Sequence, residues 1–302
     1  MIDVLQPGLM TTIQDLGRRG FESYGVPRSG AFDPFLASIA NKLTGNSIDE
    51  SLLEFALAGP TLHFHSEAVI AIAGSGVEYE LDGQAILPFR AITVAAGSVL
   101  RFVKIQGWYG YISIGGGIKS ERILGSASTY IAGGIGACLR KNEKLEMGSA
   151  SGKRFVLLES YWNFPEEPLL SLVPSQHTSH FNIRERQKIT ENSYKVDPQS
   201  NRMGIRLDGP ALEAPILRRS TPTIPGSVQV PRSGSPIILG PEGPTTGGYA
   251  QLAVIARTSW TVLAGSNPGR KIRFEWTDRE TAQKMWNYRQ KLFNSPEAWR
   301  SL

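Results

Sequence analysis

The chain has little cysteine and no long apolar run. A single cysteine, Cys138, occurs in 302 residues, which excludes an intramolecular disulfide framework and fits a reducing compartment. The longest apolar stretches, such as Ala68–Ala73, are far shorter than the ~20 residues that span a bilayer. The first residues, MIDVLQPG, do not combine the basic and apolar regions of a secretory signal. We therefore expect a cytoplasmic protein with no membrane partner.

The positive charge is not gathered into one patch. The formal net charge is +5, but the basic residues are scattered, and Glu185 interrupts their densest stretch, Arg184–Lys188. No helix-turn-helix, zinc-finger or RNA-stacking pattern accompanies them. We therefore expect a small-molecule substrate and no nucleic acid. The mild positive field of the protein suits a small anionic substrate.

Glycine and proline are abundant instead, with 32 and 19 residues, which favours many short strands joined by tight turns. Strand after strand is predicted from Leu52 to about Phe102, and a second strand-rich block from Phe181 to Trp276. Asp82-Gly83 has the composition of a two-residue hairpin turn. The fold class is therefore mostly β, with an N-terminal lobe at 1–165, a C-terminal lobe at 166–302, and strands open to exchange between the lobes.

Two helices are marked by their ends. Asp33-Pro34 is an N-cap acid followed by proline, and Gly45 is a C-terminal stop, so a helix is expected between them. A capping box at Thr277 and Glu280 predicts a helix at the C-terminal end.

One five-residue string occurs twice. Val-Pro-Arg-Ser-Gly stands at Val26–Gly30 and again at Val230–Gly234. Duplicated β architecture explains the identity, and in that account Arg28 and Arg232 are presented equivalently. A single site with these two loops as its walls is the bolder hypothesis.

Charged residues inside turns and strands are the first candidate site residues. In Thr11–Gly20, TTIQDLGRRG, Gln14, Asp15 and Arg18 lie between glycines, and an arginine there suits capture of a carboxylate or phosphate. An ordinary charged turn is the competing interpretation. Glu54 lies in an apolar strand, where it is either an acid or base of raised pKa or a buried acceptor for loop N–H groups.

Two glycine-rich loops are the second candidates. Gly115–Gly136 contains Ser126 and other small residues that let a backbone approach a ligand closely. GPTTGGYA contributes Thr245, Thr246 and Tyr249, whose hydroxyls can bond a ligand. A flexible connection between strands explains the first loop equally well, and a turn that begins a strand explains the second. Neither GGGIKS nor GSASGKR satisfies the P-loop pattern.

The four histidines form two pairs with metal-ligand spacing. His63 and His65 are interpreted as a solvated strand face, and His177 and His180 lie in a polar loop without an acid cluster. We expect no metal site.

Taken together, the motifs resemble the allophanate hydrolase subunit 2 family, also called the biotin-dependent carboxyltransferase-like family. The resemblance extends over Met1–Phe274 and is carried, in order, by VLQPGLMTTIQDLGRRGFESYGVPRSGAFD, ANKLTGN, LLEFALAGPTLHF, YISIGGGI, LGSAST, SNRMGIRLDG, GSVQVPRSGSPIIL, TTGGYAQLAVI and NPGRKIRF.

The resemblance implies two cyclophilin-like β-barrel lobes and a component of a bacterial ATP-dependent 5-oxoprolinase. Such a complex would open 5-oxoproline to glutamate together with subunits A and B, with ATP used by the complex. The chain has no Ala-Met-Lys-Met attachment site, so it carries no biotin. Two alternatives stay open: a regulator that binds a subunit-B-like inhibitor of a histidine kinase, and a carboxyltransferase component of urea degradation.

The chain departs from the family pattern mainly in its downstream half. Ala137 stands where an arginine is common, Glu242 and Pro244 replace an Asp-x-Gln pattern, and Thr258 stands in place of an aspartate. These departures put the catalytic competence of that half in question. The expected catalytic residues are Asp15, Arg18 and Glu54, and the expected substrate-binding residues are Gln14, Arg28, Ser29, Ser126, Gln229, Arg232, Thr245, Thr246 and Tyr249.

Overall fold

In the computed structural model of the chain, the described residues are 1–150, 152–158 and 168–302. They divide into two compact units. Unit 1 consists of Met1–Arg18, Ser29–Phe164 and Leu292–Leu302, and unit 2 of Arg19–Arg28 and Pro165–Lys291. The predicted boundary between residues 165 and 166 lies outside the described residues.

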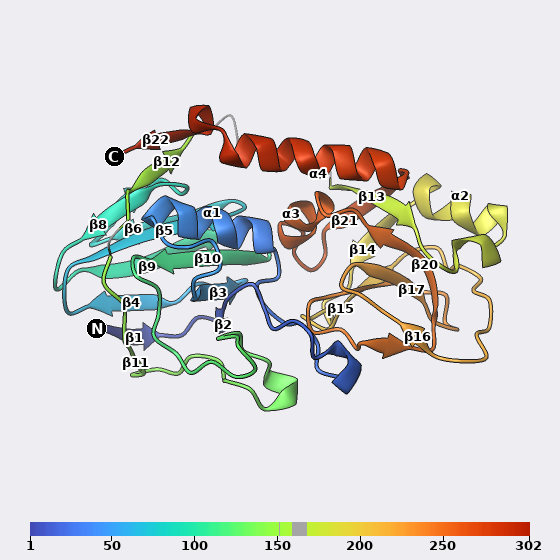
Figure 1. The fold of residues 1–302 in the computed structure, drawn as a ribbon, viewed down its shortest axis with the longest axis horizontal. Helices are drawn as coiled ribbons and strands as arrows, with labels where there is room; N and C mark the ends of the chain where they lie inside the picture. The colour runs from blue at the N-terminus through green and yellow to red at the C-terminus, as the bar shows by residue number, and fades with distance from the viewer. Residues whose placement is uncertain (151, 159–167) are drawn as a thin grey trace. The chain divides into compact units, whose positions relative to one another are not determined.

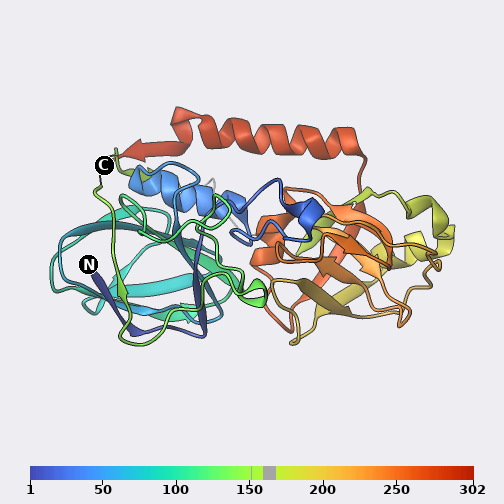
Figure 2. The same ribbon diagram turned by 60° about the horizontal axis from the view of Figure 1, so that its bottom comes forward.

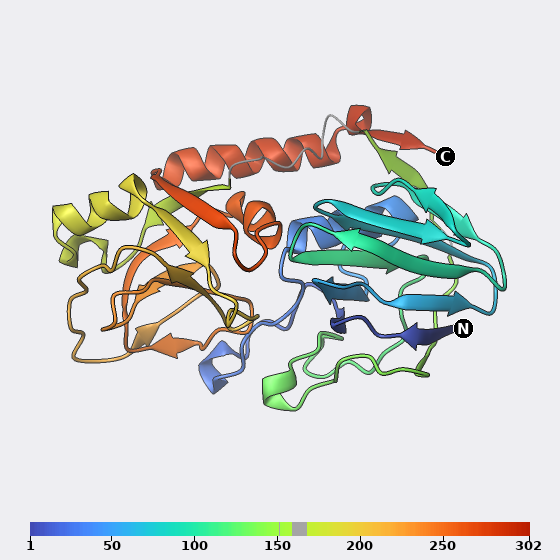
Figure 3. The same cartoon turned by 180° about the vertical axis from the view of Figure 1, so that it is seen from behind.

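Unit 1 is built from two antiparallel sheets, which Figures 1 and 3 show in blue to green. The six-stranded sheet has the order β11-β1-β4-β9-β6-β7 and the five-stranded sheet the order β2-β3-β10-β5-β8. Their strands are β1 (Ile2–Gln6), β2 (Met10–Gln14), β3 (Leu52–Ala56), β4 (Thr61–Phe64), β5 (Ala68–Gly74), β6 (Val77–Leu81), β7 (Gln84–Ile86), β8 (Ala91–Val94), β9 (Val99–Ile105), β10 (Tyr109–Ile114) and β11 (Lys144–Leu145).

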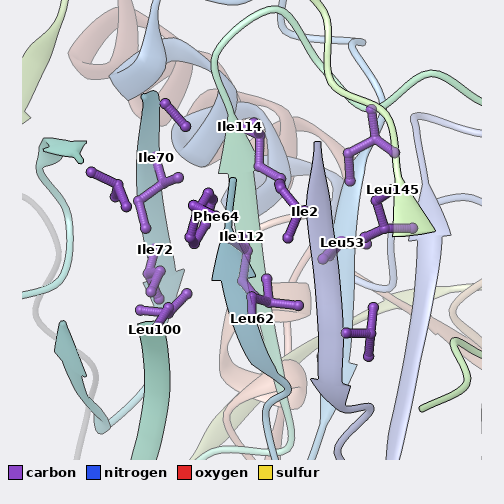
Figure 4. Packing of buried hydrophobic residues seen from close by; sticks show 14 of the residues in the cluster. Ile2, Leu53, Leu62, Phe64, Ile70, Ile72, Leu100, Ile112, Ile114 and Leu145 are labelled. Atoms are coloured by element: carbon purple, nitrogen blue, oxygen red, sulfur yellow. The ribbon is translucent and has the colours of Figure 1, made fainter. Parts of the chain in front are cut away.

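The two sheets of unit 1 share one core (Figure 4). Ile2, Leu62 and Phe64 from the six-stranded sheet pack with Ile70 and Ile112 from the five-stranded sheet, and all five side chains are fully buried. Because successive side chains of a strand point to opposite faces, one alternating set of apolar residues per strand fills this core.

Helix α1 (Pro34–Thr44) packs on β5 and β10 of the five-stranded sheet, in which β3, β5 and β10 are buried along their whole length. Asp33 caps the helix by accepting the N–H of Phe35 at 2.9 Å, and Gly45 ends it with a left-handed backbone of φ 78°. Both predicted ends of this helix are confirmed. The predicted hairpin is confirmed as well, since β6 pairs with β7 across Asp82-Gly83.

Unit 2 is a closed barrel of seven strands in the order β13-β20-β17-β18-β15-β14-β21, drawn in yellow to orange in Figure 2. The parallel pairing of β13 with β21 is an exception among antiparallel neighbours. The strands are β13 (Leu169–Pro174), β14 (Ser193–Val196), β15 (Gly204–Asp208), β17 (Ser227–Val230), β18 (Ile237–Leu239), β20 (Ala250–Ile255) and β21 (Lys271–Trp276).

Short elements accompany the barrel. A two-stranded sheet joins β16 (Thr221–Pro222) to β19 (Thr246–Gly247). The helical elements are η1 (Glu22–Tyr24), η4 (Thr178–His180), α2 (Ile183–Glu191) and α3 (Ser259–Ala264).

The C-terminal helix, α4 (Arg279–Asn294), begins later than its predicted capping box implies. Asp278 makes the cap instead of Thr277, because its Oδ1 accepts the N–H of Thr281 at 2.8 Å. Beyond the helix and η5 (Pro296–Ala298), strand β22 (Trp299–Ser301) pairs with β12 (Phe155–Leu157) in unit 1.

The mostly-β fold class is therefore confirmed. In unit 1, η2 (Ile131–Gly133) lies in the glycine-rich loop. No helix in the described ranges is both long and apolar enough to cross a bilayer.

Candidate functional site

The predicted site residues of unit 1 gather around the carboxylate of Asp15, which is buried at the end of β2. Its Oδ1 accepts the N–H of Gly17 at 2.7 Å, the hydroxyl of Ser126 at 2.6 Å and the hydroxyl of Ser128. Its Oδ2 accepts the N–H of Ala127 at 2.7 Å. One side chain thus fastens the loop that follows β2 to the glycine-rich loop.

This environment determines the protonation state of Asp15. Burial by itself raises the pKa, but the hydrogen bonds from Ser126, Ser128, Gly17 and Ala127 outweigh it and hold the pKa of Asp15 below its ordinary value. A carboxylate of lowered pKa that already accepts four bonds is a weak proton acceptor. Of the acid–base and orienting roles that are open to Asp15, the geometry therefore favours the orienting one.

Arg18 lies three residues further along the same loop and is only 2% exposed. Its guanidinium donates to the backbone carbonyl of Ser128, so the arginine is held by the loop that Asp15 also holds. Gln14 donates to Thr12 Oγ1 at 3.1 Å and to the carbonyl of Thr129 at 3.3 Å. Its Oε1 is buried and has no hydrogen-bond partner among the described residues.

Glu54 serves as an acceptor inside unit 1. Its Oε2 accepts the N–H of Phe32 at 2.6 Å, and the carboxylate also accepts the hydroxyl of Tyr111. The Tyr111 oxygen in turn accepts the N–H of Asp33 at 2.7 Å. Burial, together with the charges of Glu54 and Asp33, raises the pKa of Tyr111 well above its ordinary value, so the phenol remains a donor. Of the two interpretations left open for Glu54, this geometry favours the buried acceptor for loop N–H groups.

The first Pro-Arg-Ser-Gly loop rests on the loop of Asp15. Ser29 is buried with a left-handed backbone of φ 53°, and its Oγ has no hydrogen-bond partner in the described part of the chain. Gly30 has φ 84°, and a Cβ there would lie 2.7 Å from the backbone nitrogen of Gly17. Arg28 is half-buried and belongs to the residues of unit 2.

Among the predicted site residues of unit 2, Gln229 is the buried one. Gln229 lies in β17, and its Nε2 is buried without a hydrogen-bond partner among the described residues. A Cβ on Gly247 would lie 2.5 Å from that Nε2, so the bare glycine backbone is what lets this loop approach Gln229.

The remaining candidates of unit 2 lie nearer to solvent. Thr246 is exposed in β19, Thr245 is half-buried and accepts the N–H of Thr223 through its carbonyl, and Tyr249 is 48% exposed. Arg232 is exposed in the second Pro-Arg-Ser-Gly loop. Hydroxyl and guanidinium groups here are accessible to a ligand, whereas those of unit 1 are buried.

The surroundings of three departures from the family pattern are defined in the structure. Glu242 is buried and accepts from Arg202 Nε at 2.5 Å, so the carboxylate at this position is engaged in an ion pair inside unit 2. The carbonyl of Thr258 accepts from Arg289 at 2.9 Å. Ala137 is exposed and lines a groove of about 430 Å³ together with Cys138 and residues 140–143.

Sequence reasoning missed several polar residues of these clusters. Ser128 lies in the LGSAST motif two residues after the predicted Ser126, and nothing in the motif distinguishes the two hydroxyls. Tyr111 has the appearance of a core aromatic in β10. In unit 2, His177 Nδ1 accepts the N–H of Gln251 at 3.2 Å, and burial, with the nearby His180, lowers the pKa of His177.

Two β-rich units with glycine-rich loops over buried polar side chains are the arrangement that the resemblance to carboxyltransferase-like proteins implies. The chain belongs to the family described as the carboxyltransferase domain, subdomain A and B, which it matches over residues 24–276. The resemblance seen in the sequence motifs is thereby confirmed.

Two relatives match almost the whole chain. The chain is 31% identical to the C subunit of 5-oxoprolinase from Escherichia coli (strain K12), covering 99% of this chain and 98% of the relative. It is 32% identical to the C subunit of 5-oxoprolinase from Haemophilus influenzae, covering 94% of both. Urea amidolyase of Saccharomyces cerevisiae is 29% identical over 94% of this chain but only 17% of its own length.

Solved structures agree with this placement. The urea amidolyase of Kluyveromyces lactis matches 99% of this chain with a TM-score of 0.90 and 27% identity, and this chain spans 20% of it. The protein TTHA0988 matches 91% of this chain with a TM-score of 0.81 and 32% identity, and this chain spans 55% of its length.

Proposed function

We propose that this chain is the C-subunit-like component of a cytoplasmic ATP-dependent 5-oxoprolinase, which hydrolyses 5-oxoproline to glutamate together with subunits A and B. One observation carries the proposal: two relatives named as the C subunit of 5-oxoprolinase match the chain from end to end at 31–32% identity. That coverage leaves no large region of this chain without a counterpart in those relatives.

The chemistry of a lactam sets what the site must supply. The amide bond resists attack, so the oxygen of its carbonyl must be stabilised as negative charge develops, and the substrate carboxylate needs a cation. Arg18 is our candidate for the carboxylate or for a phosphate, with Asp15 and Ser126 holding its loop in place. Gln14 and Ser29 present buried polar atoms beside the same loop.

The accessible hydroxyls of unit 2 have a binding role in this proposal. Thr245, Thr246 and Tyr249 would position substrate, with Gln229, Arg232 and Arg28 as further polar contacts. ATP is assigned to the complex, because the sequence contains no P-loop pattern. When bound, ATP supplies the phosphoryl group that makes the lactam carbonyl a better electrophile.

The test is reconstitution with subunits A and B, measuring 5-oxoproline-dependent ATP hydrolysis and glutamate release. We expect Arg18→Ala to lower kcat/KM by about 100-fold, the scale of losing one charge-stabilising donor. Arg18→Lys keeps the charge but loses the planar fork, and we expect it to recover only part of the activity. Arg101→Ala is the matched control, because Arg101 is an exposed arginine paired with Glu80.

Unchanged turnover in folded Arg18→Ala would remove the role of this arginine. Absence of any 5-oxoproline-dependent hydrolysis in the wild-type complex would contradict the proposed function itself. A tight complex with the subunit-B-like protein in that case would support the regulator interpretation.

A second candidate function is a carboxyltransferase component of urea degradation. The observation that favours it is the TM-score of 0.90 to the Kluyveromyces lactis urea amidolyase over 99% of this chain. This reaction would need a separate biotinylated partner. Transfer of a carboxyl group to urea, measured with such a partner and without 5-oxoproline, separates the two candidates.

A further inference from the structure

Three potential metal ligands meet on the six-stranded sheet of unit 1. Asp3 in β1 lies directly across from His63 in β4, in an antiparallel pair. His65, two residues further along, places its Nε2 2.8 Å from Asp3 Oδ2. The rings of the two histidines touch edge to face, with centroids 4.6 Å apart. All three side chains therefore occupy one small area.

The strand pattern explains why they share a face. Leu62 and Phe64 alternate with the two histidines and are fully buried in the core of unit 1. Successive side chains of a strand point to opposite faces, so His63 and His65 project from the face away from that core. Because Asp3 is paired with His63, its carboxylate projects from that same face.

The donor set has the composition of a zinc site. One ligand atom from each of Asp3, His63 and His65 lies within 4.8 Å of the other two. Zinc bonds of ~2.0–2.2 Å to imidazole nitrogen and carboxylate oxygen place tetrahedral donors about 3.3 Å apart, so small side-chain rotations bring the three together. Two histidines and one carboxylate leave a fourth position for water.

The carboxylate has an oxygen available for this purpose. Asp3 Oδ1 is buried and makes no hydrogen bond to any described residue, while Oδ2 holds His65. A buried carboxylate oxygen without a donor is costly, and a bound cation satisfies it. Lys144 in β11 pairs with Asp3, and its positive charge acts on the carboxylate, which weakens cation binding there without blocking a ligand atom.

In contrast to the expectation from the sequence, we propose that Asp3, His63 and His65 form a Zn²⁺ site on the six-stranded sheet, separate from the loops assigned to 5-oxoproline. On binding, Nε2 of His65 exchanges its contact with Asp3 for a bond to the metal, and any proton on that nitrogen leaves to the other ring nitrogen or to solvent. The ion links β1 to β4, so its effect is on the stability of unit 1.

The test is zinc binding to the full chain, prepared without a polyhistidine tag and stripped of metal, by calorimetric titration with ZnCl2. We expect one Zn²⁺ per chain and a zinc-dependent rise in the melting temperature. His63→Ala and Asp3→Asn should each weaken binding at least about tenfold, the scale of perturbing a metal ligand set, and abolish the rise in melting temperature.

His180→Ala is the matched control, because His180 is exposed and paired with His177 in unit 2. It should leave zinc affinity unchanged. No binding by the wild type overturns the proposal, and so does binding that the His63 and Asp3 variants retain in full. If the metal-free variants and the metal-free wild type have equal melting temperatures, a loss of zinc binding is not caused by misfolding. None of these readouts depends on 5-oxoproline or on subunits A and B.

Discussion

The two Pro-Arg-Ser-Gly loops are identical in sequence and have the same backbone at their final glycine, with φ 84° at Gly30 and 83° at Gly234. Their serines differ. Ser29 is buried with φ 53°, whereas Ser233 is exposed and is not among the residues of positive φ. The same five-residue sequence thus gives both loops a left-handed glycine at their end. It does not determine how deeply each loop is buried.

Packing partners account for the difference. The upstream glycine lies against the backbone of Leu16 and Gly17, in the loop that Asp15 holds. The downstream glycine lies against Ala211 and Leu212, while Arg232 beside it is exposed. A site that uses both Arg28 and Arg232 stays a prediction.

The largest expected effect is the difference in stability between substitutions of Gly30 and Gly234. Gly30→Ala should lower the free energy of unfolding by about 3 kcal/mol, because its Cβ would lie within 3 Å of three backbone atoms in addition to the strain of positive φ. Gly234→Ala should lower the free energy of unfolding by a smaller amount, about 2 kcal/mol, because the exposed residues beside it can shift to accommodate the new Cβ. Urea unfolding of both variants measures this, and equal costs would mean that the two loops are held alike.

The second effect tests the carboxylate that holds the upstream loop. Asp15→Asn should lower the free energy of unfolding by about 2 kcal/mol. The asparagine NH2 group would face an N–H donor, such as that of Ala127, which now donates to the carboxylate. Asp197→Asn in unit 2 is the control, with an expected cost below about 1 kcal/mol, since the Oδ1 of Asp197 accepts the N–H of Gln199 in an exposed turn.

The pH dependence of that difference has a definite sign. The folded-state pKa of Asp15 lies below its ordinary value of 3.8, so its stabilisation is complete above that value and is lost as the pH falls through the folded pKa. The gap in unfolding free energy between wild type and Asp15→Asn should be constant from about pH 5 to 7 and narrow below pH 4. A gap that widens on acidification would contradict the lowered pKa.

The smallest effect compares the serines. Ser29→Gly relieves a left-handed backbone and should change stability by less than about 1 kcal/mol, in the stabilising direction, whereas Ser233→Gly should be slightly destabilising. If Ser29 contacts substrate, as we predict, Ser29→Gly should also raise the KM for 5-oxoproline in the reconstituted complex. If Ser29→Gly leaves the KM unchanged, as expected for Ser233→Gly, Ser29 does not contact the substrate.

Local signals predicted the local structure well. The ends of α1 follow from Asp33, Pro34 and Gly45, because caps act through hydrogen bonds to residues a few positions away. The cap of α4 was misplaced by one residue, since Thr277 and Asp278 are both good caps and only the bond to Thr281 distinguishes them. The chain division was harder to foresee, because Arg19–Arg28 joins unit 2 and Leu292–Leu302 joins unit 1 across long sequence separations.

The candidate site shows the same limit. The sequence identified the loops of Asp15 and Ser126 as polar and glycine-rich, but not that the two side chains bond each other across 111 residues. Nor did it decide between two roles for Glu54, because that choice depends on the N–H of Phe32 and the hydroxyl of Tyr111, which meet the carboxylate only in the folded chain.

By itself the sequence determined the mostly-β class, the family, and which face of β4 carries His63 and His65, since a period of two residues is a property of any strand. Only the tertiary structure decided what meets those residues. The pairing of β1 with β4 brings Asp3 to the histidines, and packing against Gly17 buries one of two identical loops. Such contacts depend on register and on chain segments far apart in sequence, for which neighbouring residues carry no signal.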